Sequence, residues 1–283
     1  MRRFYTFEQA IRETSTTLDH FGVEVDTGHW QGVPTEGKPD LVTKELMGWD
    51  FEVPVWRANP PTLMGELIPV LKREIRPNLP WADDHFKERV SRVPSNPGEA
   101  YKTWPWWRGQ SQETNAGDWT DPHDFKFTHT YQERFWPKPQ GQWVEGMQTG
   151  IHYKYGDLDD LIDLLLREPY TRQAYLPIFF PEDTGAVHGG RIPCTLGYHF
   201  LLRQNKLHMW YFLRSCDFVR HFRDDIYLAV RLLLWVLNQL QRDGGNDREE
   251  GDNSWGWNEV LPGTFHMVIG SLHYHKGDEH IAG

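Results

Sequence analysis

The amino-acid sequence predicts an α+β fold, because extended apolar segments and amphipathic helical segments both recur along the chain. Two apolar segments, 195–202 and 207–213, flank the short polar sequence Gln204-Asn205-Lys206, a pattern typical of a β-hairpin. Apolar side chains recur at helical spacing over 226–240, which predicts a helix with one buried face. The apolar stretch 262–275 near the end of the chain predicts another strand.

The first part of the chain predicts two helices and two strands. Thr6-Phe7-Glu8-Gln9 has the form of a capping box, so a helix should begin there and end at Gly22. Strands are expected at 23–25 and 45–55. A second helix is expected over 63–73, with a kink or break at Pro69, since proline removes a helical hydrogen bond.

The middle of the chain contains one clear helix and one long irregular region. Residues 157–168 have a strong apolar face, and Asp157 is the expected N-cap. Residues 108–142 are polar, rich in Gly, Pro and Trp, and show no period, which predicts a loop insertion that could cover a cleft. An acidic loop is expected over 243–253.

Composition limits the classes of function. A chain of 283 residues can bury a substantial core, and we expect one domain over 1–283. A formal net charge of −10 disfavours polymeric nucleic acid as a partner. Two cysteines outside any CxxC pattern favour a reducing cytoplasm over a disulfide framework, and no signal peptide or membrane span is expected.

Two short motifs carry the chemistry. Pro193-Cys194 stands at the predicted start of one hairpin strand, and Arg214-Ser215 stands at the predicted end of the other, in a turn-rich link over 214–223. Both motifs can therefore face one cleft. A lone cysteine is more often a buried core residue, so the order of the motifs matters more than either motif alone.

This order of motifs resembles the thymidylate synthase family, which includes the deoxycytidylate hydroxymethylases. The resemblance rests on Pro193-Cys194, on Arg214-Ser215-Cys216-Asp217 and on Asp225, eight residues after that Asp. It implies a thymidylate synthase-like catalytic domain with a large mixed sheet flanked by helices. One sheet face would form the interface of a homodimer.

The resemblance also implies a role for each matching residue. Cys194 would be the nucleophile, Arg214 and Ser215 would bind the nucleotide phosphate, and Asp217 would bind the folate. The positions that would cross the dimer interface to a phosphate are Arg172 and Gln173, of which Gln173 lacks the charge of the family's second arginine.

At the sugar, His273 matches the family's histidine, and His275 stands where the family has a tyrosine. A metal site formed by His273, His275 and His280 is the weaker interpretation of these histidines, so no metal is expected. The family's early phosphate-binding arginine has no counterpart between Arg12 and Arg57.

Three further residues match the family in shorter segments. Glu66 aligns with the catalytic glutamate, whose role requires burial near the ring, although an exposed helical glutamate is the commoner arrangement. Trp81 would stack on the folate. Tyr101 would join the proton network above C5, with a core tyrosine as the competing interpretation.

In the family, the side chain at the position of Asp225 contacts the edge of the pyrimidine, and thymidylate synthases have an asparagine there, so the resemblance implies that Asp225 selects the base. The amide of an asparagine both donates and accepts, so it can pair with uracil, whereas an ionised aspartate only accepts. Cytosine offers an exocyclic amine as donor, so Asp225 favours a cytidine monophosphate, with dCMP the expected substrate. A mismatched base would leave a buried polar group unpaired.

The resemblance implies transfer of a one-carbon unit from 5,10-methylenetetrahydrofolate to C5 of dCMP, through a Cys194 thiolate adduct at C6. Only eight residues follow His275, too few for the tail that excludes water in thymidylate synthases, so hydroxymethylation is favoured. Methylation of dCMP, a dUMP-directed enzyme and a catalytically silent nucleotide-binding protein remain as alternatives.

Overall fold

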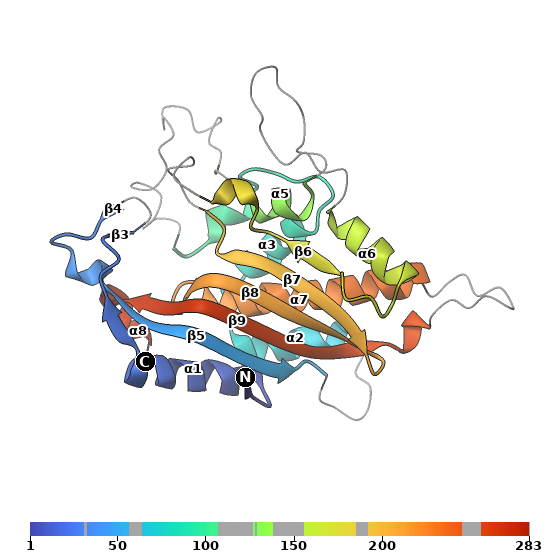
Figure 1. Cartoon of the computed structure of the whole chain (residues 1–283), viewed down its shortest axis with the longest axis horizontal. Helices are drawn as coiled ribbons and strands as arrows, with labels where there is room; N and C mark the ends of the chain where they lie inside the picture. The colour runs from blue at the N-terminus through green and yellow to red at the C-terminus, as the bar shows by residue number, and fades with distance from the viewer. Residues whose placement is uncertain are drawn as a thin grey trace, which may run out of the picture.

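The computed structural model describes residues 1–30, 33–56, 64–106, 127, 129–137, 156–184, 192–244 and 256–282. An open mixed sheet in the order β1-β5-β9-β8-β7-β6, with β2 also paired to β5, forms its centre (Figure 1). The pairs β1–β5 and β8–β9 are parallel and the others are antiparallel. Its strands are β1 (Arg2–Arg3), β2 (Val23–Val25), β5 (Thr43–Pro54), β6 (Tyr175–Pro177), β7 (Thr195–Arg203), β8 (Lys206–Asp217) and β9 (Leu261–His275).

Helices flank this sheet and complete the predicted α+β class, and β3 (His29–Trp30) pairs with β4 (Val33–Pro34) apart from it. The α-helices are α1 (Phe7–Phe21), α2 (Met64–Ile75), α3 (Trp81–Arg89), α5 (Tyr131–Phe135), α6 (Leu158–Arg167), α7 (Phe222–Gly244) and α8 (Glu279–Ala282). Short 3-10 turns occur at η1 (Pro39–Leu41), η2 (Ala100–Thr103), η4 (Pro181–Asp183), η6 (Trp257–Glu259) and η7 (Lys276–Asp278). In the described part of the chain, no helix has the length and hydropathy that a membrane crossing needs.

The core lies between one face of the sheet and helices α1, α2 and α7. Phe51 of β5 packs against Phe222 of α7 with ring centroids 6.0 Å apart, and Phe265 of β9 packs against Phe7 of α1 at 5.9 Å. Alternate residues of β8 point into this core and are buried, namely Leu207, Met209, Tyr211 and Leu213. In Figure 1 the strands lie in front of α2 and α7, and the sheet's other face is turned toward the viewer.

Local sequence signals predicted several elements correctly. The hydroxyl of Thr6 caps α1 by accepting a hydrogen bond from the backbone N–H of Gln9 at 3.0 Å. Gln204 and Asn205 form the hairpin turn between β7 and β8 with φ angles of 51° and 58°, the left-handed conformation that two-residue hairpins favour. The predicted strand at 262–275 is β9, and the predicted helix at 157–168 is α6.

Other boundaries differ from the predictions. Strand β8 continues to Asp217, so Arg214 and Ser215 lie on a strand and not in a turn-rich link. Helix α7 begins at Phe222, which places Asp225 in its first turn. Helix α2 continues past Pro69 to Ile75; because Pro69 is exposed, water can satisfy the carbonyl that lacks a helical partner.

The predicted insertion over 108–142 lies mostly outside the described residues. Its described part, residue 127 and residues 129–137, contains helix α5, which begins with a capping box formed by Thr130 and Glu133. This part is therefore ordered structure and not a loop throughout.

Candidate active site

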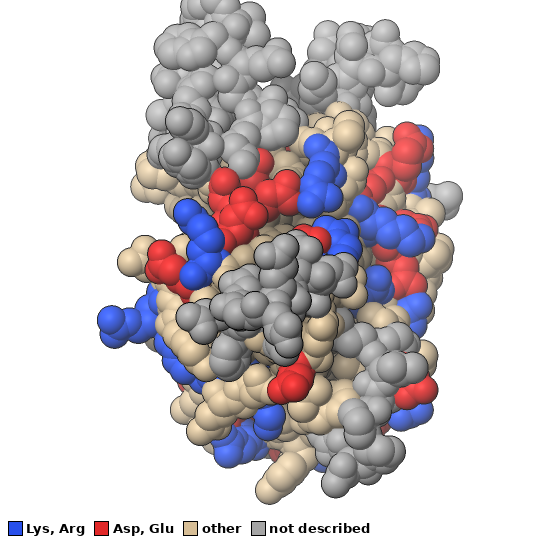
Figure 2. Space-filling view, turned by 90° about the vertical axis from the view of Figure 1, so that its right-hand side faces the viewer, with Lys and Arg blue, Asp and Glu red and all other residues tan. Residues whose placement is uncertain are grey.

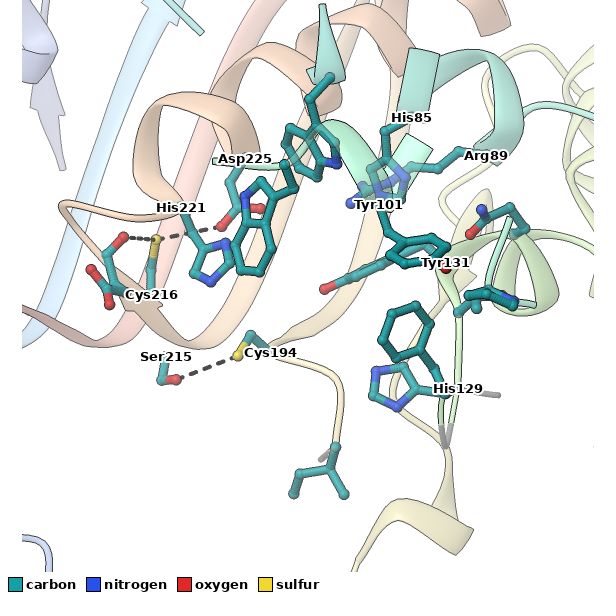
Figure 3. Close-up of a pocket in the computed structure, with 18 residues that line it drawn as sticks. His85, Arg89, Tyr101, His129, Tyr131, Cys194, Ser215, Cys216, His221 and Asp225 are labelled. Atoms are coloured by element: carbon teal, nitrogen blue, oxygen red, sulfur yellow. Dashed lines mark hydrogen bonds between the residues drawn. The ribbon is translucent and has the colours of Figure 1, made fainter. Parts of the chain in front are cut away.

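A pocket opens beside the amino-terminal end of β7 and the first turn of α7, and residues from distant parts of the chain line it (Figure 3). One wall of the pocket is lined by Cys194, by Ser215 and Asp217 of β8, and by Asp225 of α7. The opposite wall comes from α3, η2 and the segment around α5. That wall contains Trp81, His85, Arg89, Tyr101, Trp104, Phe127, His129, Thr130, Tyr131 and Gln132.

The sulfur of Cys194 has two polar neighbours on β8. The Ser215 hydroxyl Oγ lies 3.7 Å from Sγ, and Nη2 of Arg214 lies 3.8 Å from it. Arg214 also donates from Nε to the carbonyl of Pro193 at 2.9 Å and from Nη2 to that of Ile192 at 3.1 Å. These bonds fix a guanidinium beside the sulfur, and Cys194 itself remains partly exposed to the pocket.

Asp225 presents a carboxylate to the same pocket. The thiol of Cys216 donates to its Oδ2 at 3.5 Å. Burial raises the pKa of Asp225 to about 7, and the positive charge of Arg89 opposes this shift. Near neutral pH the carboxyl group is therefore poised between its ionised and protonated forms.

The neighbouring Asp224 has a structural role. Its two oxygens accept hydrogen bonds of 2.7 Å from the backbone N–H and from Nδ2 of Asn78, in the segment that leads into α3. Burial raises the pKa of Asp224 to about 6. Of the two adjacent aspartates, Asp225 lines the pocket and Asp224 holds two segments together.

Tyr131 is a pocket residue that the sequence analysis missed. Its hydroxyl lies 3.0 Å from Oγ1 of Thr195, which lies 2.9 Å from the hydroxyl of Tyr211. Burial raises the pKa of Tyr131, so its hydroxyl stays protonated at neutral pH. Figure 3 shows this hydroxyl pointing toward the side of the pocket that holds Cys194 and Asp225. The expected residue, Tyr101, also lines the pocket, so two tyrosines are candidates for one role.

Stacked aromatic side chains form much of the wall contributed by α3 and η2. Trp81 stacks on His85 with centroids 4.9 Å apart, and Trp104 stacks on His221 at 5.1 Å. The two indole rings are 5.9 Å apart. Burial lowers the pKa of His85 to about 4, and the positive charge of Arg89 contributes to this shift. The imidazole is therefore neutral at pH 7. The wall is therefore largely apolar and planar, as a stacked ligand requires.

Asp217, His273 and His275 form a polar cluster at the end of β8 and β9, because the parallel register pairs Asp217 with His273. Nε2 of His275 is buried without a hydrogen-bond partner and lies 4.0 Å from Oδ2 of Asp217. The ligand atoms of the three residues lie within 4.8 Å of one another, a spacing that a divalent cation could use. However, Nε of Arg220 lies 3.7 Å from the same Oδ2, and this charge disfavours a cation there.

Six of the expected residues do not line the pocket. Arg214 contacts the sulfur of Cys194, and His273 and His275 lie beside Asp217. The other three, Glu66, Arg172 and Gln173, lie elsewhere. Helix α2 buries Leu67, Leu71 and Ile75 on one face, and Glu66 lies exposed on another. The burial expected for a catalytic Glu66 is therefore not observed. Arg172 and Gln173 are exposed beside β6, and they line a separate surface hollow over 168–173.

Comparisons with known proteins add no assignment. No model of a known protein family matches this chain, and a search of curated proteins finds no similar sequence. The geometry of the pocket and the motifs that form it are therefore the basis for a function.

Proposed function

We propose that this chain transfers a one-carbon unit from 5,10-methylenetetrahydrofolate to C5 of a pyrimidine nucleoside monophosphate, with dCMP preferred and 5-hydroxymethyl-dCMP as product. The observation that supports this most is the meeting of the Cys194 sulfur and the Asp225 carboxyl group in one pocket, from positions 31 residues apart (225 − 194). A nucleophile and a group that distinguishes bases are the two parts that such a reaction needs.

The proposed mechanism begins with addition of the Cys194 thiolate to C6 of the ring, which makes C5 nucleophilic. Asp225 accepts a hydrogen bond from the exocyclic amine, and Arg214 with Ser215 holds the phosphate beside the sulfur. Methylenetetrahydrofolate supplies the one-carbon unit at the oxidation level of formaldehyde. C5 attacks the methylene carbon of the folate and forms the new carbon–carbon bond. Loss of the C5 proton, passed to solvent through the hydroxyl of Tyr131, then breaks the bond between that carbon and the folate nitrogen, so that tetrahydrofolate leaves and an exocyclic methylene remains on the ring. Water then adds to the one-carbon unit as Cys194 leaves C6.

The residues of the pocket fit a folate. Trp81 and Trp104 provide planar apolar surface, and both line the pocket. Oδ1 of Asp217 accepts hydrogen bonds from two backbone N–H groups at 3.0 Å, those of Val219 and Arg220, so this carboxylate is held rigidly. Its Oδ2 lies 3.7 Å from Nε of Arg220, beyond hydrogen-bond distance, and would accept from the ligand. A pterin ring has N–H donors that match such an acceptor.

The proposal includes a homodimer formed through the outer face of the sheet. On that face Trp210 stacks on His266 with centroids 4.0 Å apart, and Phe212 and Val268 are partly exposed neighbours. Nε2 of His199 lies 3.0 Å from the carbonyl oxygen of Arg172, so Arg172 stands at the edge of this face. From there its side chain would reach the phosphate bound by a second subunit.

Surface charge supports a small nucleotide over a nucleic acid strand. Figure 2 shows Lys and Arg interspersed with Asp and Glu on the face that it displays, with no continuous basic surface among the residues drawn in colour. A strand of nucleic acid would need such a surface, whereas a monophosphate needs only local cations such as Arg214.

Release of tritium from C5-labelled dCMP, CMP and dUMP, with and without methylenetetrahydrofolate, tests the proposal. We expect folate-dependent release, fastest with dCMP, and mass spectrometry of the product should show a hydroxymethyl group. Absence of release from all three nucleotides would refute the enzymatic function. A mixture of inactive Cys194→Ala and Arg172→Ala proteins should regain activity if the dimer shares its sites.

A further inference from the structure

Arg89 is a buried cation of the pocket that the proposed mechanism does not use. It is the last residue of α3, and its side chain is 4% exposed. Its guanidinium lies over the ring of Tyr131 at 4.0 Å, and its Nε has no hydrogen-bond partner. No carboxylate of the described residues lies within ion-pair distance of it. Burial of a cation without an ion pair is costly, so its position in a pocket calls for a reason.

Arg89 and Asp225 line the same pocket, and both are charged groups held away from bulk water, so the charge of Arg89 favours the ionised form of Asp225. The charged and titratable groups that act on Asp225 come from the elements packed around it: Arg89 of α3, Tyr131 of α5, Asp224 of α7, Tyr198 of β7, and Tyr211, Cys216 and Asp217 of β8. Cys194, His85 and His221 line the same pocket. Within this set Arg89 is the cation. The carboxylates and the burial of the site favour protonation of Asp225, and Arg89 opposes them.

The protonation state of Asp225 changes which base it can bind. An ionised carboxylate only accepts hydrogen bonds, so it pairs with the amine of cytosine. A protonated carboxyl group presents one donor and one acceptor, the same pair as an asparagine amide. In that form it can donate to O4 and accept from N3–H of uracil.

We propose that Arg89 is a positioning residue that biases base specificity toward cytosine, because its charge favours the carboxylate form of Asp225. This inference rests on the proposed function. Arg89 acts through Asp225 and makes no contact with the base in this role.

The test compares Arg89→Met, which removes the charge, with Arg89→Lys, which keeps it. Arg92→Met is the control, because Arg92 is exposed and forms an ion pair with Asp159 away from the pocket. The readout is the ratio of kcat/KM for dCMP to that for dUMP, from tritium release between pH 6 and 9. At pH 7 the ratio should fall about tenfold in Arg89→Met, as expected if the pKa of Asp225 rises by about one unit. The ratio should recover toward pH 9, and Arg89→Lys and Arg92→Met should keep the wild-type ratio. An equal loss of both activities at every pH would overturn the inference.

A second measurement separates this inference from the proposed function. The carboxyl carbon of Asp225 can be titrated by ¹³C NMR in the protein without nucleotide, with Asp225→Asn for assignment. Arg89→Met should raise the pH at which this signal titrates, even if the wild type releases no tritium from any nucleotide. Arg89→Gln serves the same purpose if thermal melting shows that Arg89→Met is unfolded. An unchanged titration in the folded neutral variant would overturn the role of Arg89.

Discussion

The pocket has two walls of different construction. One wall is the β7–β8 hairpin with the first turn of α7. There Ser215 and Asp225 lie on long hydrogen-bonded elements, and Cys194 immediately precedes β7. The other wall is built from short helices, where Arg89 and Tyr131 are packed against each other. Under the proposed function the two walls have different roles: the regular wall would hold the reacting side chains in place, and the short-helix wall would set their electrostatic environment.

The largest expected effect on activity comes from a substitution in the regular wall. Cys194→Ser should lower the rate of tritium release by about 10⁴-fold or more, because an alkoxide is far harder to form than a thiolate and no other nucleophile is expected at C6. Binding of dCMP, measured by calorimetry, should remain. Cys216→Ser is the comparison, since a serine there can still donate to Asp225 and should keep most of the activity. Equal loss in both variants would contradict the assignment of Cys194.

Asp225→Asn should change the choice of base on that wall. An asparagine pairs with uracil and leaves the cytosine amine without a charged acceptor, so the ratio of kcat/KM for dCMP to that for dUMP should fall by about 10³-fold. Competition between the two nucleotides in one reaction measures the ratio directly. An unchanged preference for dCMP would remove Asp225 from base recognition.

Substitutions in the short-helix wall should reduce activity by a smaller factor. Tyr131→Phe removes the hydroxyl that lies 3.0 Å from Thr195 and should slow loss of the C5 proton by about 10²-fold, a typical size for one group in proton transfer. Tyr101→Phe should slow it by less than about tenfold. Single-turnover tritium release compares the two variants. The reverse order would return the proton-transfer role to Tyr101.

The smallest expected effect is on stability, and it has a definite pH dependence. The pKa of Asp225 is about 7 in the folded protein and 3.8 for an ordinary exposed aspartate, so the free-energy penalty for its buried charge grows as pH rises through this interval and is complete above pH 7. Asp225→Asn should therefore raise the free energy of unfolding at pH 8 by about 1–2 kcal/mol, after allowance for screening by pocket water. Below pH 4 the two proteins should be equal. Urea unfolding at pH 4 and 8 gives the comparison.

Several expectations about the site depended on where helices begin and which face they bury. The motifs around Cys194 and Ser215 were visible because a hairpin brings sequence neighbours together across its strands. Glu66 was placed in a helix correctly, but the face that α2 buries follows Leu67, Leu71 and Ile75, and this leaves Glu66 exposed. A short match to a motif therefore located the element and not the direction of the side chain.

Tyr131 and Arg89 were missed for a different reason. Tyr131 begins a helix of five residues inside a segment with no hydrophobic period, and the capping box at Thr130 was the one local signal that could have revealed it. Arg89 has the sequence environment of an ordinary surface cation at a helix end. Its burial depends on the packing of α3 against α5 and α7, which no local pattern records.

By itself, the sequence determined the cap of α1, the turn between β7 and β8 and the amphipathic α7, because each depends on residues only a few positions apart. The tertiary structure decided which of two adjacent aspartates lines the pocket: Asn78 donates hydrogen bonds to Asp224, and Asp225 lines the pocket. It also placed His273 beside Asp217 through a parallel register across 56 positions (273 − 217). Both outcomes arise from contacts between distant segments, whose free energy depends on packing that a local pattern does not contain.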